Sequence, residues 1–381
     1  MKKNNVLIFC FSLFFLAAQS VFSQKIFRVI ILCPDATISK NLIVEYDNGK
    51  TTKTTRQKFV NGHLTLTDTF YAFKAMITIS KIDSNQHFSN SYFVNELPAT
   101  FAYKSIDSSR KKLVLENSNA LDLGDAGENE LKNYTSKEEL DVSEYFRKNG
   151  SKVAGNDSAA IAESNLKISA IINKRLEFVL LNNSSYFSFY YFRKNLIGNL
   201  ILPPDSLLKL YNTTFPKAFR KSFEGDEIVK FLNGRLLSAA KHSISPNFST
   251  VDINGKKVEL YKMRGKFVLI SFWATWCSPC VAELPAMREI RNITSDTKLE
   301  IISISYDTDK ELFLKGIKKY EMNWVNIFYD EDISKKFGVS SLPMLFLIDD
   351  KGRVVYSRKS DETSYTKLGV LRKIIDRANL Q

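Results

Sequence analysis

Cysteine and histidine are both scarce in this chain, which has 4 cysteines and 3 histidines among 381 residues. Four cysteines are too few for a fold held together by disulfide bonds, which needs them at much higher density. Three histidines argue against a histidine-rich metal enzyme. We therefore expect neither a metal site nor a cofactor.

Dense clusters of basic charge are also missing, although 54 Lys and Arg against 41 Asp and Glu give a net charge of +13. The nearest approach to a cluster is Arg110-Lys111-Lys112. A nucleic-acid-binding surface typically gathers its Lys and Arg on one face or along one helix. We therefore interpret the excess charge as a solvated basic surface and expect no nucleic-acid partner.

The apolar run near the N-terminus, residues 6–18, is shorter than the roughly 20 residues that span a membrane. It follows Lys2 and Lys3, and a small residue, Ser23, stands before a plausible cleavage point. This order is typical of a secretory signal peptide, here residues 1–23. An uncleaved anchor is the alternative. Cleavage predicts a periplasmic or otherwise extracytoplasmic protein without membrane attachment.

The rest of the chain divides into three segments by pattern. Residues 24–105 alternate short apolar runs with turn signals such as Asn48-Gly49, which predicts a small antiparallel β domain. Residues 106–240 predict a linker followed by a helical domain. Its aromatic stretch at residues 186–192 is interpreted as a buried helix face or as a ligand platform. Residues 241–381 form the last segment.

Strand and helix patterns alternate through residues 241–381. A dense apolar strand at 266–272 precedes a helix from Cys277 to about Arg291, and a second buried strand follows at 299–305. A further helix, a strand, a hairpin around residues 344–356 and a terminal helix complete the series. This order predicts an α/β fold whose central mixed sheet has helices on both faces.

Trp276-Cys277-Ser278-Pro279-Cys280 lies between the first of these strands and its helix. The positive end of a helix favours a thiolate at Cys277 and lowers its pKa. We therefore expect Cys277 at the exposed edge as the attacking nucleophile and Cys280, more buried, as the resolving thiol. Half of a zinc site and a static structural disulfide are the alternatives.

This segment resembles the active site of the thioredoxin superfamily and is most similar to the TlpA/ResA-like extracytoplasmic thiol–disulfide oxidoreductases. The frame Cys-x-x-Cys-x-x-Glu-x-Pro is matched by Cys277, Cys280, Glu283 and Pro285. Residues 265–270 and 338–349 also match, so the resemblance covers about residues 241–381. Residues 24–240 resemble the N-terminal extension of related secreted proteins of Bacteroidetes-type bacteria.

The resemblance implies roles for several residues. Pro343 is expected to be cis and to face the cysteines, and Trp276, Pro279 and Leu342 to help bind the substrate. Glu283 is expected to line the cavity and to tune or accept the thiol proton, a solvated surface glutamate being the alternative. Thioredoxins proper carry a buried Asp in the strand before the motif, where this chain has Ser271.

The expected function is therefore that of an enzyme, a thiol–disulfide oxidoreductase that reduces protein disulfides, as in cytochrome c maturation. Its partners would be client proteins with disulfides or cysteines and an envelope electron donor of the membrane thiol-reductase type. A peroxiredoxin-like peroxidase and a metallochaperone are alternatives. The peroxidase pattern has a Thr three residues before its reactive cysteine, whereas Thr275 is two residues before Cys277.

Residues 24–240 remain open as a client-binding or dimerising module. Their cysteine, Cys33, is interpreted as a buried small apolar residue or as the site of an intermolecular disulfide.

Overall fold

The computed structural model describes residues 25–55, 58–83, 86–109, 111–240, 242–358 and 368–378. The chain forms two compact units, one of Met1–Ser89 with Phe93–Ala120 and one of Asn90–Tyr92 with Leu121–Gln381. The predicted signal peptide lies outside the described residues. Within them, no helix combines the length and the apolar content needed to cross a membrane.

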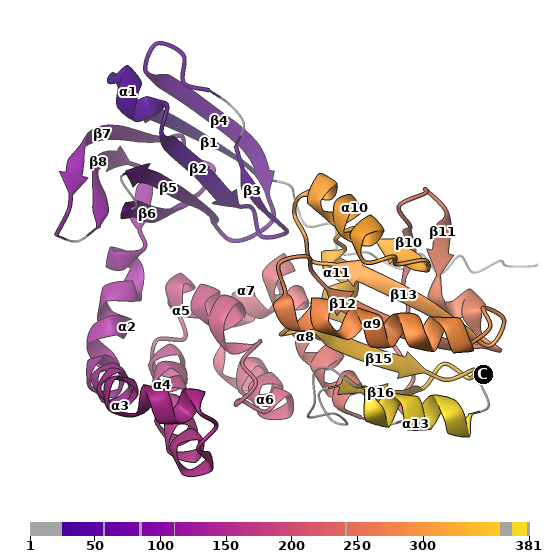
Figure 1. Ribbon diagram of the computed structural model, residues 1–381. Coiled ribbons are helices and arrows are strands. Elements are labelled where there is room, and N and C mark those ends of the chain that lie inside the picture. The colour runs from indigo at the N-terminus through magenta and orange to yellow at the C-terminus, as the bar shows by residue number, and fades with distance from the viewer. Residues whose placement is uncertain are drawn as a thin grey trace, which may run out of the picture. The chain divides into compact units, whose positions relative to one another are not determined.

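The N-terminal part of the chain is built from two β-sheets (Figure 1). One sheet has the strand order β4-β1-β7-β8 and the other the order β3-β2-β5-β6-β9. The strands are β1 (Lys25–Leu32), β2 (Leu42–Asp47), β3 (Thr52–Thr54), β4 (His63–Phe70), β5 (Ala75–Asp83), β6 (Gln86–Val94), β7 (Ala99–Asp107), β8 (Lys112–Ser118) and β9 (Ala120–Asp122), with a short helix α1 (Ala36–Ser39) after β1.

Strand β1 shows why these segments form sheets. Its residues Phe27, Val29 and Ile31 are fully buried, because alternate side chains of a strand point to the same face. Strand β1 pairs antiparallel with β4 and parallel with β7. The sheet is therefore mixed at this pair, where the sequence predicted antiparallel strands throughout.

The start of the predicted linker is a β-strand. Strand β8 pairs antiparallel with β7 from Thr100 to Asp107, and its Leu113 is buried. The sequence of β8 is rich in charged and polar residues because much of that edge strand is exposed. Strand β8, Lys112–Ser118, therefore completes a sheet where we expected a linker.

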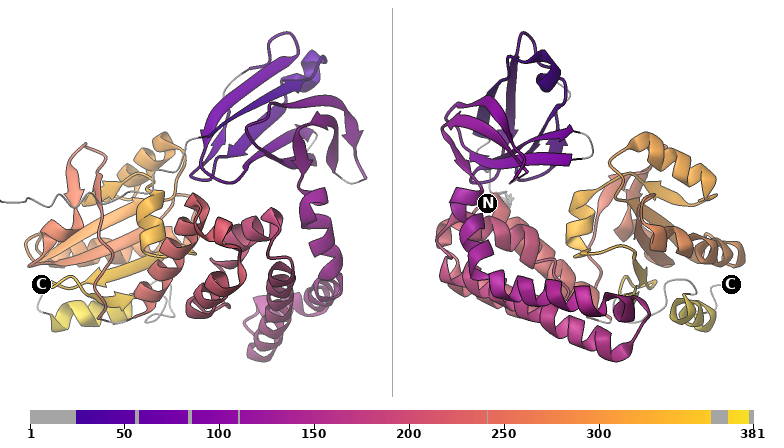
Figure 2. Two further views of the ribbon diagram at one scale, coloured as in Figure 1. Left: turned by 180° about the vertical axis from the view of Figure 1, so that it is seen from behind. Right: turned by 60° about the vertical axis from the view of Figure 1, so that its left-hand side comes forward.

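A run of helices follows, and the two long ones lie side by side in both views of Figure 2. These are α3 (Ser136–Ala154) and α4 (Ser158–Leu181). Asp157 caps α4 by accepting a hydrogen bond from the Ala160 N–H, as an N-cap residue does. The other helices are η1 (Gly124–Glu128), α2 (Asn129–Tyr134), α5 (Tyr186–Tyr191), η2 (Phe192–Leu196), α6 (Pro204–Thr214), α7 (Lys217–Arg220) and α8 (Phe223–Ala239).

The aromatic stretch at residues 186–192 belongs to the core of this helical segment. Phe187, Phe189 and Phe192 are buried, and the ring of Phe189 stacks on that of Phe219 with their centroids 4.6 Å apart. The stretch is therefore a buried helix face, and the ligand-platform interpretation is wrong.

A five-stranded sheet forms the centre of the C-terminal part, with the order β14-β13-β12-β15-β16. Strand β12 pairs parallel with β13 and antiparallel with β15, so the sheet is mixed. The strands are β12 (Phe267–Trp273), β13 (Leu299–Ser305), β14 (Val325–Ile327), β15 (Met344–Ile348) and β16 (Val354–Ser357), and a separate hairpin joins β10 (Ser249–Val251) to β11 (Lys257–Glu259) before the short helix η3 (Leu260–Met263).

Helices cover both faces of this sheet (Figure 1). They are α9 (Ser278–Ile293), α10 (Lys310–Lys319), α11 (Glu331–Lys336) and α13 (Gly369–Arg377). One apolar cluster contains Leu269 with residues of α9 and α13, and the other contains Val268 and Ile270 with residues of α11. The alternation along β12 thus fills both cores, and the predicted α/β fold is confirmed.

Helix α8 packs directly on the chain that precedes β15. A Cβ atom added at Gly234 would lie 2.5 Å from the Lys336 carbonyl oxygen and 2.6 Å from the Gly338 nitrogen. Gly338 in turn has a φ of 59°, in the left-handed region that favours glycine. The helix therefore supports the segment that leads from α11 to Pro343.

Candidate functional site: a disulfide at the start of a helix

The two cysteines of the motif form a disulfide at the N-terminus of α9. The S–S distance is 2.03 Å and the two Cα atoms lie 5.2 Å apart. Cys277 is the N-cap of the helix, and the Cys280 N–H donates a hydrogen bond of 3.3 Å to the Cys277 sulfur. After reduction, this N–H and the helix dipole favour the thiolate of Cys277.

The two sulfurs differ in what they face. A cavity of 550 Å³ opens beside Cys277, whereas Cys280 is not among its lining residues. Cys277 is 6% exposed and Cys280 is 2% exposed. Cys277 lines the cavity but is more enclosed than the exposed edge we expected.

The predicted substrate-binding residues lie around this cavity. Trp276, Pro279 and Leu342 all line it, and Trp276 is 68% exposed. Pro343 is buried and is not a lining residue, although it directly follows Leu342. The Leu342–Pro343 peptide bond is cis, as the resemblance implies.

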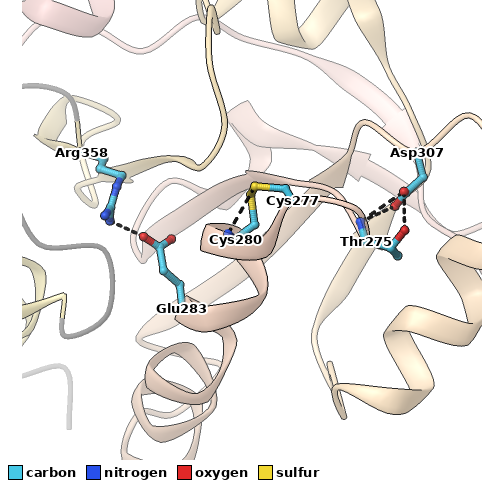
Figure 3. Close-up of a disulfide and its surroundings, with 6 residues drawn as sticks. All are labelled: Thr275, Cys277, Cys280, Glu283, Asp307 and Arg358. Atoms are coloured by element: carbon cyan, nitrogen blue, oxygen red, sulfur yellow. Dashed lines mark hydrogen bonds and ion pairs between the residues drawn. A yellow bond between two sulfur atoms is a disulfide. The ribbon is translucent and has the colours of Figure 1, made fainter. Parts of the chain in front are cut away.

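Glu283 is buried one helical turn after Cys280, on the same helix. Its Oε1 atom lies 2.5 Å from Nη1 of Arg358, in an ion pair whose side chains are 2% and 5% exposed. The contact is an approach of charges and not an aligned hydrogen bond. Figure 3 shows Glu283 extending from α9 toward Arg358. Glu283 is therefore not a solvated surface residue.

Asp307 is a buried carboxylate beside the site that the sequence analysis did not identify. Its Oδ1 and Oδ2 atoms accept hydrogen bonds from the Thr275 N–H at 3.2 and 3.1 Å, and Oδ1 accepts a bond of 2.7 Å from the Thr275 hydroxyl. The Ser305 hydroxyl donates to Oδ2 at 2.7 Å. Asp307 thus connects the end of β13 to the loop before Cys277, opposite Glu283 in Figure 3.

A signal for Asp307 is present in the sequence. Parallel strands place their carboxyl ends at one edge of a sheet, where sites form. Asp307 comes two residues after the end of β13, and the cysteine motif follows the end of the adjacent parallel strand β12. An acidic residue at that position is therefore a candidate for the same edge.

Cys33 lies in the other unit and is fully buried as a free thiol. Burial, with a smaller effect of Asp35, raises the pKa of its thiol. A buried, protonated thiol is a poor nucleophile. This environment supports the interpretation of Cys33 as a small apolar residue and not as the site of an intermolecular bond. Among the described residues, no group of three or more His, Cys, Asp and Glu is placed to hold a metal ion.

The family match falls in the C-terminal part of the chain, which carries the disulfide. A family model described as the AhpC/TSA family matches residues 243–357. A thiol–disulfide oxidoreductase ResA of Bacillus thuringiensis is 37% identical over 131 residues, which cover 34% of this chain and 76% of the relative. The chain belongs to the ResA family of thiol–disulfide oxidoreductases. It is a thiol–disulfide oxidoreductase of the thioredoxin fold.

A second ResA protein and two solved structures are also similar to this chain. The ResA protein of Bacillus subtilis is 37% identical over 123 residues, which cover 31% of this chain and 69% of the relative. A solved thiol:disulfide interchange protein from a Bacteroides species is 27% identical and covers 37% of this chain and 92% of its own, with a TM-score of 0.33. A putative thiol:disulfide interchange protein DsbE from Chlorobium tepidum is 22% identical, covers 36% and 98%, and has a TM-score of 0.33.

Proposed function

We propose that this chain reduces disulfide bonds in client proteins outside the cytoplasm through a cycle of Cys277 and Cys280. The observation that carries the proposal is the disulfide at the start of α9, where Cys277 but not Cys280 lines an open cavity. A client sulfur that enters this cavity meets Cys277 first.

Reduction of the client proceeds by two successive thiol–disulfide exchanges. The Cys277 thiolate attacks one sulfur of the client disulfide, forms a mixed disulfide and releases the other client sulfur as a thiolate. The Cys280 thiolate then attacks the Cys277 sulfur, restores the Cys277–Cys280 bond and releases the second client thiolate. Two electrons pass to the client, whose thiolates take up protons.

Glu283 and Arg358 support the second exchange in this proposal. The Cys280 thiol must lose its proton before it attacks, and Glu283 lies one turn further along the same buried helix face. Glu283 is the carboxylate placed to accept that proton, and its ion pair with Arg358 holds it in position. Trp276, Pro279, Leu342 and the Pro343 that follows form the client-binding surface.

The cycle requires a second partner that supplies electrons. A dithiol donor of the membrane thiol-reductase type would reduce the Cys277–Cys280 disulfide by the same exchange chemistry. The expected signal peptide supports a location outside the cytoplasm, where cytochrome c biogenesis is one process that consumes reduced thiols.

Single-cysteine variants test the assignment directly. With a dithiol donor and a protein disulfide such as insulin, Cys277→Ser should abolish reduction, and Cys280→Ser should accumulate a mixed disulfide visible by mass. Cys33→Ala is the matched control, because Cys33 is a buried free thiol of the other unit, and it should retain activity. Full reduction by Cys277→Ser would contradict the proposal.

Peroxide consumption by the same variants separates this function from a peroxidase. The proposed reductase should consume peroxide no faster with a thiol donor than the Cys277→Ser variant does. Fast, Cys277-dependent consumption together with slow insulin reduction would favour the peroxidase instead.

A further inference from the structure

A second cavity of 300 Å³ adjoins the one beside the disulfide. Both are lined by Tyr306, Val339 and Ser340, so the two cavities lie next to each other along this strip. The volume is at the lower end of the roughly 300–1,000 Å³ of ligand-binding cavities. A molecule that reaches Cys277 can therefore extend into the second cavity without leaving the surface.

The far wall of the second cavity comes from the helical segment and not from the thioredoxin-like fold. Gly198, in the turn after η2, and Phe231, on α8, line it. A Cβ atom added at Gly198 would lie 3.9 Å from the Ser340 Cβ and 4.0 Å from the Phe231 ring. Gly198 thus lies close to both Ser340 and Phe231. A domain that begins at residue 241 would lack the part of the cavity wall that Gly198 and Phe231 form.

The lining of this cavity fits an apolar or aromatic side chain. Its rings include Tyr306 and Tyr329, which meet edge to face with centroids 6.0 Å apart. Burial raises the pKa of Tyr306 to about 12, so the ring is neutral over the physiological range. Charged residues also line the cavity, and most of them are paired: Lys335 lies 2.6 Å from Glu227 and 2.9 Å from Glu331, and Arg193 lies 3.3 Å from Glu224. The aromatic surface is therefore the part of the lining that gains from being covered.

We propose that this second cavity binds a large apolar or aromatic side chain of the client polypeptide, close in sequence to the cysteine that Cys277 attacks. The client segment lies extended along Tyr306, Val339 and Ser340, with its sulfur at Cys277 and the side chain against the wall that Gly198 and Phe231 form together. The inference rests on the proposed function for the identity of the client, and on the residues that the two cavities share for the path.

The test uses the full chain and a series of peptides. Each peptide carries one cysteine as a disulfide with a small thiol, and a tryptophan moves from position to position on either side of that cysteine. At one position, tryptophan should raise kcat/KM about tenfold over alanine, which corresponds to burial of one aromatic side chain. If no position shows such a preference, the inference is overturned.

Variants at Gly198 locate the effect. Gly198→Leu fills the cavity and should reduce the tenfold preference to about one, whereas Gly198→Ala should keep it because the added Cβ makes only ordinary contacts. Phe231→Ala removes one wall and should lower the preference several-fold, which covers the case of a Gly198→Leu chain that does not fold. Gly150→Ala, on α3 with nothing within 4 Å, is the distant control. A preference that survives in both cavity variants would overturn the inference.

Binding of the same peptides with serine in place of cysteine separates this inference from the proposed function. These peptides cannot react, so their dissociation constants report the cavity alone. A tryptophan preference in binding that Gly198→Leu removes supports the cavity even if no peptide is reduced. Reduction without any binding preference supports the reductase and overturns the cavity.

Discussion

Asp307 holds the loop in front of the cysteines through both the backbone and the side chain of Thr275. Asp307→Ala should lower kcat/KM for a protein disulfide by up to about 100-fold, since small displacements of reacting groups have effects of that size. It should also lower the unfolding free energy by about 1–3 kcal/mol, because buried donors lose their acceptor. Rates and urea denaturation measure the two effects.

Asp309→Ala is the matched control for this prediction. Asp309 is an exposed N-cap of α10 that accepts from the N–H groups of Glu311 and Leu312. Its loss should lower the unfolding free energy by about 1 kcal/mol and leave kcat/KM unchanged. Equal losses of activity in the two variants would show that Asp307 has no special effect on the loop.

The Glu283–Arg358 pair predicts a large and specific loss of stability. Arg358→Met leaves the Glu283 carboxylate buried without its counter-charge, and removal of one partner of a buried pair costs about 3–5 kcal/mol. The exposed pair of Arg288 and Glu321 provides the comparison, and Arg288→Met should change stability by about 0–1 kcal/mol. Urea denaturation of the oxidised proteins measures both, and similar small changes would contradict the prediction.

The sequence predicted some residues of the site and not others for a physical reason. Cys277, Cys280 and Glu283 share one helix, so their spacing alone places them on neighbouring turns. Asp307 and Arg358 reach the site from β13 and from the end of β16, and no local period connects them to the cysteines. Such partners follow from the order of the strands in the sheet, as for Asp307, and not from their spacing along the chain.

Helix α8 acts as a support for the chain that leads to Leu342. Gly234→Ala would push a methyl group against the carbonyl oxygens of Lys335 and Lys336, which are backbone atoms and cannot swing away. Overpacking of this kind costs about 1–3 kcal/mol, more than the roughly 1 kcal/mol that alanine gains in a helix. Thermal denaturation should show a lower Tm, and kcat/KM should fall as the segment before Pro343 shifts.

Gly150→Ala should stabilise the protein, in contrast to Gly234→Ala. Gly150 is inside α3 and an added Cβ would meet nothing within 4 Å. The helix should gain about 0.5–1 kcal/mol from the lower entropy of the unfolded chain. A Gly234→Ala protein as stable as Gly150→Ala would mean that α8 moves freely against its neighbour.

Elements with a strong period were predictable, and weakly patterned ones were not. Strand β12 is apolar almost throughout because both of its faces are buried, so its sequence marks it as a strand. Strand β8 has one buried residue and a polar remainder, so its sequence could not be distinguished from that of a linker. Its pairing with β7 depends on the register between the two strands, which cannot be predicted from local composition.

At the scale of the molecule, the predicted boundary at residue 240 separates parts that touch closely. The Ser238 hydroxyl donates to the Phe337 carbonyl oxygen, and Lys335 pairs with Glu227 of α8. A chain of residues 121–381 should therefore fold and reduce a small disulfide. A chain of residues 241–381 should unfold at lower urea concentration, since loss of the Ser238–Phe337 hydrogen bond alone costs about 1 kcal/mol.

Denaturation of the two shortened chains in the same redox state measures this difference. The full chain is the reference for both. Equal midpoints for the two pieces would show that the helical segment adds nothing to the fold that carries the cysteines, and that the boundary predicted from the sequence is also a boundary of stability.

The burial of Cys33 determines the electron capacity of the described chain. One exchangeable pair of sulfurs is present there, and the remaining thiol is enclosed in a separate unit. Within the described residues, electrons are therefore carried in twos by the Cys277–Cys280 pair, and Cys33 is not placed to relay them. Each turnover must empty and refill the same pair, so the client and the electron donor have to use this site in alternation.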